Sequence, residues 1–94
     1  MNNAEVIGIV AAILTTGSFL PQAAKLLQTH ETAAISLTMY SMFTAGVALW
    51  LAFGLYTMQW SIIIANAVTL VLAGTILAMK VRAVIATARN ARKV

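Results

Sequence analysis

The chain has 94 residues, of which 62% are hydrophobic and only 9% are charged. A soluble domain usually carries about a quarter charged residues, so this composition excludes an ordinary soluble protein and predicts one small membrane domain over residues 1–94. The absence of cysteine excludes disulfides, a thiolate nucleophile and a thiolate metal site. The net charge of +4 comes from a few clustered basic residues without interleaved aromatic residues, and we expect no nucleic-acid partner.

The first apolar run, Val6–Leu27, carries no charge before Lys25. It exceeds the roughly 20 residues that cross a bilayer, so we predict a first span near 5–27. Thr15, Ser18 and Gln22 recur at helical spacing and form one polar stripe. This stripe either bonds to neighbouring helices or faces a water-filled path, and the sequence leaves both open.

The only proline of the chain, Pro21, falls inside this run and is followed by Gln22. A proline within a helix removes one backbone hydrogen bond and crowds the preceding turn, where Gly17 and Ser18 lie. In a bilayer the freed carbonyl needs another partner, and the Gln22 amide is such a group. We therefore predict a hinge at Pro21 and Gln22.

A polar stretch at residues 28–32 predicts a loop, and its lone His30 is assigned no chemistry. The next 48 residues, Thr32–Met79, contain no charge and would make a helix more than twice as long as the hydrocarbon thickness of about 30 Å. The run must therefore reverse once, most simply at the polar patch 57–60. This predicts spans near 34–57 and 60–80, followed by a basic tail at 81–94.

With three spans, the first loop and the tail lie on one side of the membrane. All six Lys and Arg residues fall on that side. By the positive-inside rule this side is cytoplasmic and the N-terminus lies outside.

Two side chains near mid-membrane stand out. Trp50 lies about eight residues before the predicted reversal and Asn66 about seven after it, so both sit at a depth of roughly 11–12 Å on adjacent helices. A buried amide needs hydrogen-bond partners or water, and the two together predict a shared polar pocket. Gly46, Trp50 and Gly54 recur every four residues, which predicts a stripe without side chains above or below the indole; small residues at such positions also allow close helix packing.

The spans contain no deep acid or base, which favours passive over proton-coupled transport. Nothing in the chain forms a nucleophile–base pair or a metal cluster, so we expect no enzyme, no cofactor and no metal.

These residues resemble a known family. Pro21-Gln22 near the cytoplasmic end of the first span is similar to the motif of PQ-loop proteins, and the chain closely resembles the bacterial SemiSWEET sugar transporters. The residues that carry this likeness run from about Phe19 to Leu77: Pro21-Gln22, Ile35-Ser36, Met39-Tyr40, Phe43, Gly46, Trp50 and Ile64-Ala65-Asn66.

The resemblance implies an all-α bundle of three transmembrane helices, a single PQ-loop repeat that works as a parallel homodimer. It implies that Trp50 and Asn66 of both protomers bind a mono- or disaccharide of the glucose or sucrose class. Pro21 and Gln22 would form the hinge for alternating access. Phe19, Met39 and Phe43 would narrow the cytoplasmic side.

The outer gate departs from some relatives, which use a tyrosine and an Arg/Asp pair. Phe53, Thr57 and Gln59 stand at the corresponding positions, so we expect Phe53 to close this side by apolar packing. Two alternatives remain: a PQ-loop transporter of amino acids or another small polar solute, and a membrane assembly subunit without cargo.

Overall fold

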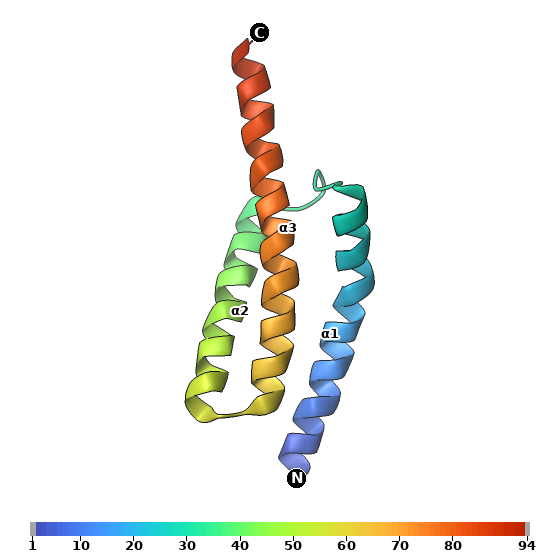
Figure 1. The fold of residues 1–94 in the computed structure, drawn as a ribbon, viewed down its shortest axis with the longest axis vertical. Helices are drawn as coiled ribbons and strands as arrows, with labels where there is room; N and C mark the ends of the chain where they lie inside the picture. The colour runs from blue at the N-terminus through green and yellow to red at the C-terminus, as the bar shows by residue number, and fades with distance from the viewer. Residues whose placement is uncertain (1, 94) are drawn as a thin grey trace.

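The structure, a computed structural model, describes residues 2–93 and contains three helices within them: α1 (Asn3–Thr29), α2 (Leu37–Thr57) and α3 (Trp60–Lys93). Each helix is long and apolar enough to cross a membrane. α3 lies between the other two and packs against both, with α1 running parallel to it and α2 antiparallel (Figure 1). The described part of the chain is therefore all-α, as the sequence predicts.

Local caps explain where the helices begin and end. The Asn2 side chain accepts a hydrogen bond from the Glu5 backbone N–H (2.7 Å), and the Ser36 hydroxyl accepts one from Met39 N–H (3.1 Å). His30 and Met58 end α1 and α2 in the left-handed conformation, with φ of 58° and 55°. The chain thus reverses at 58–59, inside the predicted patch, whereas the second helix begins later than residue 34 because Ser36 caps it.

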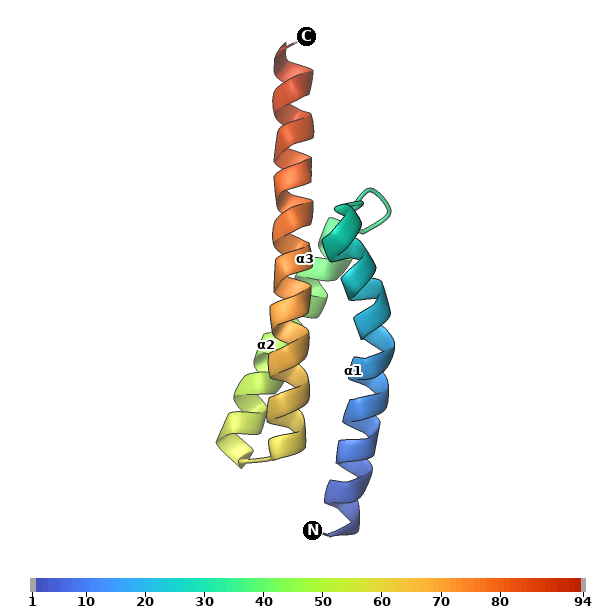
Figure 2. The same ribbon diagram turned by 45° about the vertical axis from the view of Figure 1, so that its right-hand side comes forward.

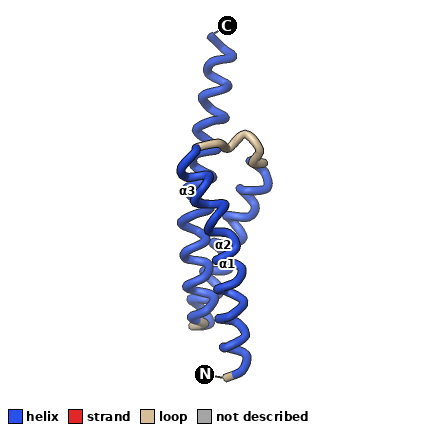
Figure 3. Tube along the Cα trace, turned by 90° about the vertical axis from the view of Figure 1, so that its right-hand side faces the viewer, coloured by secondary structure: helices blue, strands red, loops and turns tan. Residues whose placement is uncertain are grey.

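α3 continues well beyond the predicted end of the third span. It runs without interruption to Lys93, and its last turns project past the α1–α2 loop (Figure 3). The segment is rich in alanine, arginine and other good helix formers, and its terminal Arg92 and Lys93 complement the negative end of the helix dipole. The predicted basic tail is therefore a helical extension of α3 through Lys93, and Val94 lies outside the described residues.

The core lies at the end of the bundle that carries the α1–α2 loop. Its buried members come from all three helices and are surrounded by partly buried apolar side chains. The buried set is Ala23, Tyr40, Ala73 and Ile76. By contrast, the N-terminal part of α1 exposes its large apolar side chains, which suits a helix that faces lipid or a partner.

Two glycines allow close helix contacts at the opposite end. A Cβ on Gly54 would lie 2.8 Å from Ile62 Cγ2 and 3.2 Å from the Ile63 backbone nitrogen, and one on Gly8 would lie 3.1 Å from Ser61 Oγ. Gly54 thus serves close packing of the α2–α3 hairpin, which is one of the two roles that the sequence predicts for these glycines, whereas a Cβ on Gly46 would meet nothing within 4 Å. Each step of four residues turns a helix by 40°, so two steps from Gly46 carry Gly54 onto another face.

α1 is continuous through Pro21 and changes direction along its length (Figure 2). Proline has no N–H, so the Gly17 carbonyl lacks the usual helical donor. One turn earlier, the Thr15 hydroxyl donates to the Ala11 carbonyl (3.0 Å) and the Ser18 hydroxyl to the Thr15 carbonyl (2.9 Å). Such side-chain bonds to the helix backbone favour bending, and they concentrate just before the proline.

Candidate functional site

A groove of about 520 Å³ runs along the protomer where the three helices converge. α1 contributes one wall, α2 the opposite wall and α3 the floor between them. The lining residues are Thr15, Thr16, Ser18, Phe19, Gln22, Phe43, Val47, Trp50, Ala65, Asn66 and Thr69. The groove therefore collects most of the polar and aromatic side chains that the sequence singled out.

Trp50 and Asn66, which the sequence places at similar depth, both line this groove. The Trp50 indole is 57% exposed and packs edge-on against Phe53, with ring centroids 5.5 Å apart and an interplanar angle of 87°. Asn66 Nδ2 donates to the Ile62 carbonyl of its own helix (2.8 Å). Within residues 2–93 this is the hydrogen bond that the Asn66 side chain makes.

The polar stripe of α1 forms the facing wall. Thr15, Ser18 and Gln22 all line the groove, which supports the second of the two readings, a wet path. The hydroxyls of Thr15 and Ser18 donate to backbone carbonyls and keep acceptor lone pairs for other groups. The sequence reasoning missed Thr16 and Thr69; Thr69 could have been found, because it lies one turn after Asn66 on the same face of α3.

Phe19 and Phe43 come together at the core end of the groove. Their ring centroids lie 6.3 Å apart, and Tyr40 packs on Phe43 at 6.0 Å with a T-shaped geometry. This contact joins side chains of α1 and α2, whose backbones are separated by α3. Two of the three residues expected to narrow that side therefore touch.

Pro21, Met39 and Phe53 do not line the groove in the protomer. Pro21 is exposed, and Phe53 packs against Trp50, which lines the groove. Met39, Phe43, Trp50 and Phe53 nevertheless share one face of α2 by helical spacing, and all four are exposed. The neighbouring face, with Tyr40, Val47 and Gly54, is the one that packs against α3.

None of the lining residues is acidic or basic, and residues 2–93 hold no group of three or more potential metal ligands. The groove offers an aromatic face, an amide, hydroxyls and apolar rings. This set can bind a neutral polar molecule through stacking and hydrogen bonds, whereas it supplies no acid–base or metal chemistry.

Comparison with known proteins agrees with the motif and the fold. The model of the PQ loop repeat matches residues 4–64, which include Pro21 and Trp50. The chain belongs to the PQ-loop family. Three similar proteins are each named Sugar transporter SemiSWEET. The one from Escherichia coli is 44% identical over 70 residues, covering 74% of this chain and 79% of that protein.

The other two SemiSWEETs are equally similar. The protein from Bradyrhizobium diazoefficiens is 45% identical over 78 residues (83% of this chain, 91% of that one). The protein from Leptospira biflexa is 50% identical over 66 residues (70% and 78%). Within the PQ-loop proteins, the chain thus belongs to the SemiSWEET family.

Solved structures give the same result. A SemiSWEET crystallised in the inward-open conformation superimposes with a TM-score of 0.78 at 38% identity, covering 99% of this chain and all of that one. A bacterial homologue of SWEET transporters gives 0.73 at 33% identity, covering 86% and 98%. The protein is therefore a three-helix membrane protein of a transporter family, and not an enzyme.

Proposed function

We propose that this protein is a passive sugar transporter that works as a parallel homodimer by alternating access. The observation that carries the proposal is the groove lined by the Trp50 indole and the Asn66 amide, from different helices, together with a polar stripe and no charged residue. The relatives named as sugar transporters support the cargo.

The side chains suit a sugar. One face of a sugar ring presents C–H groups that pack on an aromatic ring, and its rim presents hydroxyls that bond to amides. The Trp50 indole and Asn66 amide supply these two contacts, with the hydroxyls of α1 opposite. A zwitterionic amino acid would want charged partners, and the groove lining has none.

The protomer supplies only part of an enclosure. Trp50 is exposed, and so is the rest of the α2 face that holds Met39, Phe43 and Phe53. A second copy related by a two-fold axis along the pathway would face this surface with the same surface and surround the solute. Each protomer then gives half of the site.

The gates and the hinge follow from this arrangement. Phe19, Met39 and Phe43 of both copies narrow the cytoplasmic side, and Phe53 closes the outer side through apolar packing. Pro21 and Gln22 permit α1 to bend between the two states. Since no titratable group lines the groove, movement of the sugar is driven by its own gradient.

The basic residues set the orientation in the bacterial inner membrane. Lys25 and the five basic residues of α3 lie toward the end with the α1–α2 loop and the C-terminus (Figure 1). The opposite end, with the N-terminus and the hairpin, has no Lys or Arg. The positive-inside rule then places the N-terminus outside and the C-terminus in the cytoplasm.

The decisive experiment measures uptake of radiolabelled glucose and sucrose into liposomes, for the wild type and Trp50→Ala, with and without a pH gradient. We expect uptake that requires Trp50 and ignores the gradient. If neither sugar is taken up but an amino acid is, the transported solute is an amino acid and not a sugar. If no solute enters and Trp50→Ala only destabilises the protein, the chain is an assembly subunit.

A further inference from the structure

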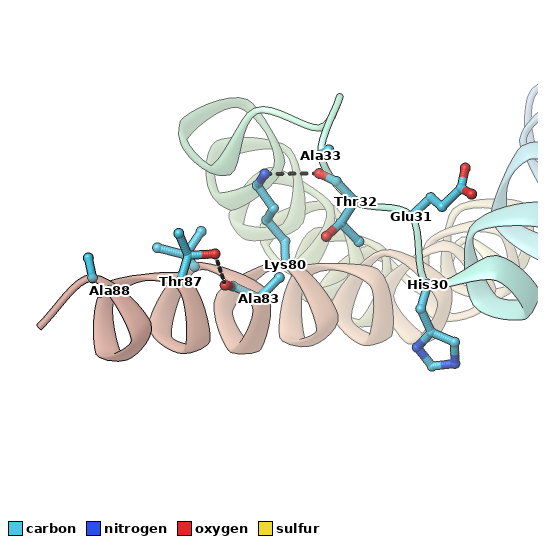
Figure 4. A pocket seen from close by; sticks show the side chains of 10 residues that line it. His30, Glu31, Thr32, Ala33, Lys80, Ala83, Thr87 and Ala88 are labelled. Carbon is cyan, nitrogen blue, oxygen red and sulfur yellow. Dashed lines mark hydrogen bonds between the residues drawn. The ribbon is translucent and has the colours of Figure 1, made fainter. Parts of the chain in front are cut away.

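One hydrogen bond differs from every other side-chain hydrogen bond in residues 2–93. Twelve of the thirteen join residues at most four positions apart. The exception joins Lys80 Nζ on α3 to the Thr32 carbonyl in the α1–α2 loop, at 2.9 Å and across 48 positions (Figure 4). It is the long-range polar link of the described bundle.

The surroundings of Lys80 and Thr32 both favour this hydrogen bond. Lys80 follows Ile76 by one helical turn, so its alkyl chain extends from the edge of the core while its ammonium reaches the rim. Thr32 is only 4% exposed. The bond is charge-assisted, because a protonated amine donates to a carbonyl dipole, and such bonds are stronger than neutral ones.

The Thr32 carbonyl also accepts from the Ile35 backbone N–H (3.0 Å), which closes the turn before Ser36 caps α2. Lys80 thus holds the turn from which α2 starts. Upstream, only Glu31 separates Thr32 from His30, where α1 ends. This contact therefore adds a polar link from α3 to the loop between α1 and α2, beside the buried core that packs the same helix ends together.

These ends carry the cytoplasmic gate residues. Phe19 on α1 and Phe43 on α2 touch each other, whereas within the described residues the α1 and α2 backbones form no packed interface. The buried core packs both ends against α3, and the loop that joins them is bonded to α3 through Lys80. The cavity beside the link, about 750 Å³, is open on the far side of Lys80, and the side chains of His30 and Glu31 point away from the ammonium (Figure 4).

We propose that Lys80 is a positioning residue of the cytoplasmic gate, whose bond to the Thr32 carbonyl forms in one transport state and opens in the other. The inference rests on the proposed alternating access. The bond is present in a structure that superimposes on an inward-open SemiSWEET with a TM-score of 0.78. The proposal assigns the bond to the inward-open state, so that its loss shifts the population outward.

The test uses a single cysteine reporter, since the natural chain has none. Thr69→Cys places a thiol in the groove, where a membrane-impermeant maleimide reaches it from the cytoplasm or from outside according to state. Labelling rates are compared in inside-out and right-side-out vesicles. Lys80→Met keeps the alkyl chain and removes the donor, so the ratio of cytoplasmic to outer labelling should fall about fivefold or more, as expected from the loss of one hydrogen bond.

Two variants separate this role from a general charge or folding effect. Arg82→Met removes a cation at nearly the same depth from an exposed position on another face of α3, and should leave the ratio unchanged. Lys80→Arg keeps a charged donor and should keep most of the wild-type ratio of cytoplasmic to outer labelling. An unchanged ratio in Lys80→Met, or an equal change in Arg82→Met, overturns the proposal.

A second measurement keeps Lys80 intact, in case Lys80→Met does not assemble. Spin labels at Ala33→Cys and Val84→Cys face each other across the rim cavity, in dimers diluted with unlabelled protein. If the Lys80–Thr32 bond opens and closes, the two spin labels should show two separations whose populations change when sugar is added. A single separation under all conditions overturns the proposal. Labelling of Thr69→Cys from one side only, with Lys80 present, would instead refute alternating access itself.

Discussion

The two ends of the bundle are held together differently. At the loop end, buried side chains from all three helices fill a common core around Ala23, Tyr40 and Ile76. At the hairpin end, the helices meet through glycines, with Gly54 against Ile62 and Gly8 against Ser61. Large side chains can fill the space between helices whose backbones are well separated, although such packing tolerates small displacements poorly. A glycine contact instead requires the two helix backbones to lie close together.

Between these ends α1 separates from α3. A groove of about 500 Å³ with an almost entirely apolar lining, including Ile13, Gly17 and Leu20, opens on one face, and the polar groove of about 520 Å³ opens where α2 joins. The proposed site thus lies between the two packed ends, whereas the proposed hinge at Pro21 lies at the edge of the loop-end core, between Phe19 and Ala23. The following variants test each part of that comparison.

The largest effect is expected at the loop end. Ile76 is fully buried, so Ile76→Ala should leave a cavity and lower the free energy of unfolding in detergent by about 2–4 kcal/mol. Leu49→Ala is the control, because Leu49 is 72% exposed and should change stability by less than about 0.5 kcal/mol. Equal losses in both variants would mean that this end has no packed core.

The hairpin end should be sensitive to one added methyl group. Gly54→Ala places a Cβ against the Ile63 backbone, which cannot move without shifting α3, and should cost about 1–3 kcal/mol of unfolding free energy. Gly74→Ala, with no atom within 4 Å of its Cβ, should be neutral or stabilising by up to about 1 kcal/mol. A Gly54→Ala protein as stable as wild type would contradict the close contact.

Removing the amide from the groove should weaken binding rather than folding. Asn66→Ala should raise the sugar dissociation constant, by about 1–2 kcal/mol in binding free energy, because a hydroxyl loses its partner. Equilibrium titration measures this. Thr75→Ala, which removes an exposed hydroxyl of α3 outside the groove, should keep wild-type affinity, and an unchanged affinity in Asn66→Ala would rule the amide out of the site.

The hinge variant should separate binding from movement. Pro21→Ala restores the missing N–H donor to the Gly17 carbonyl, straightens α1 and should slow uptake several-fold, which corresponds to about 1 kcal/mol in the barrier. Sugar affinity should stay within about twofold. Leu20→Ala serves as the exposed neighbour, and full uptake by Pro21→Ala would exclude the hinge.

The smallest effect on sugar uptake is expected from a pH gradient. No titratable group lines the groove, so imposing a pH gradient should change neither the initial rate nor the final level of sugar uptake into liposomes. Sugar accumulation above equilibrium with the gradient present would show coupling and would require an acid or base that moves into the pathway.

Much of the site follows from helical spacing once the spans are placed. Trp50 and Asn66 flank one reversal at similar distances, and an antiparallel hairpin brings such positions to one depth. The same spacing puts Thr15, Ser18 and Gln22 on one face of α1. The four-residue spacing of Gly46, Trp50 and Gly54 did not decide which glycine packs closely, because each step adds a rotation of about 40° and brings Gly54 to the face of α2 that meets α3. The hydrogen bond of Lys80 to the loop could not be predicted from the sequence, because its acceptor is a backbone carbonyl, which every residue carries.

The sequence alone determined the membrane class, the number of helices and the place of the α2–α3 reversal, because hydrophobic run length and local polarity decide these independently of distant contacts. It also determined the family, through residues at characteristic spacing. Only the tertiary structure decided that α3 lies between α1 and α2 and that Lys80 holds the loop. Such features arise from which faces of separate helices meet, and periodicity within one helix carries no information about its partner.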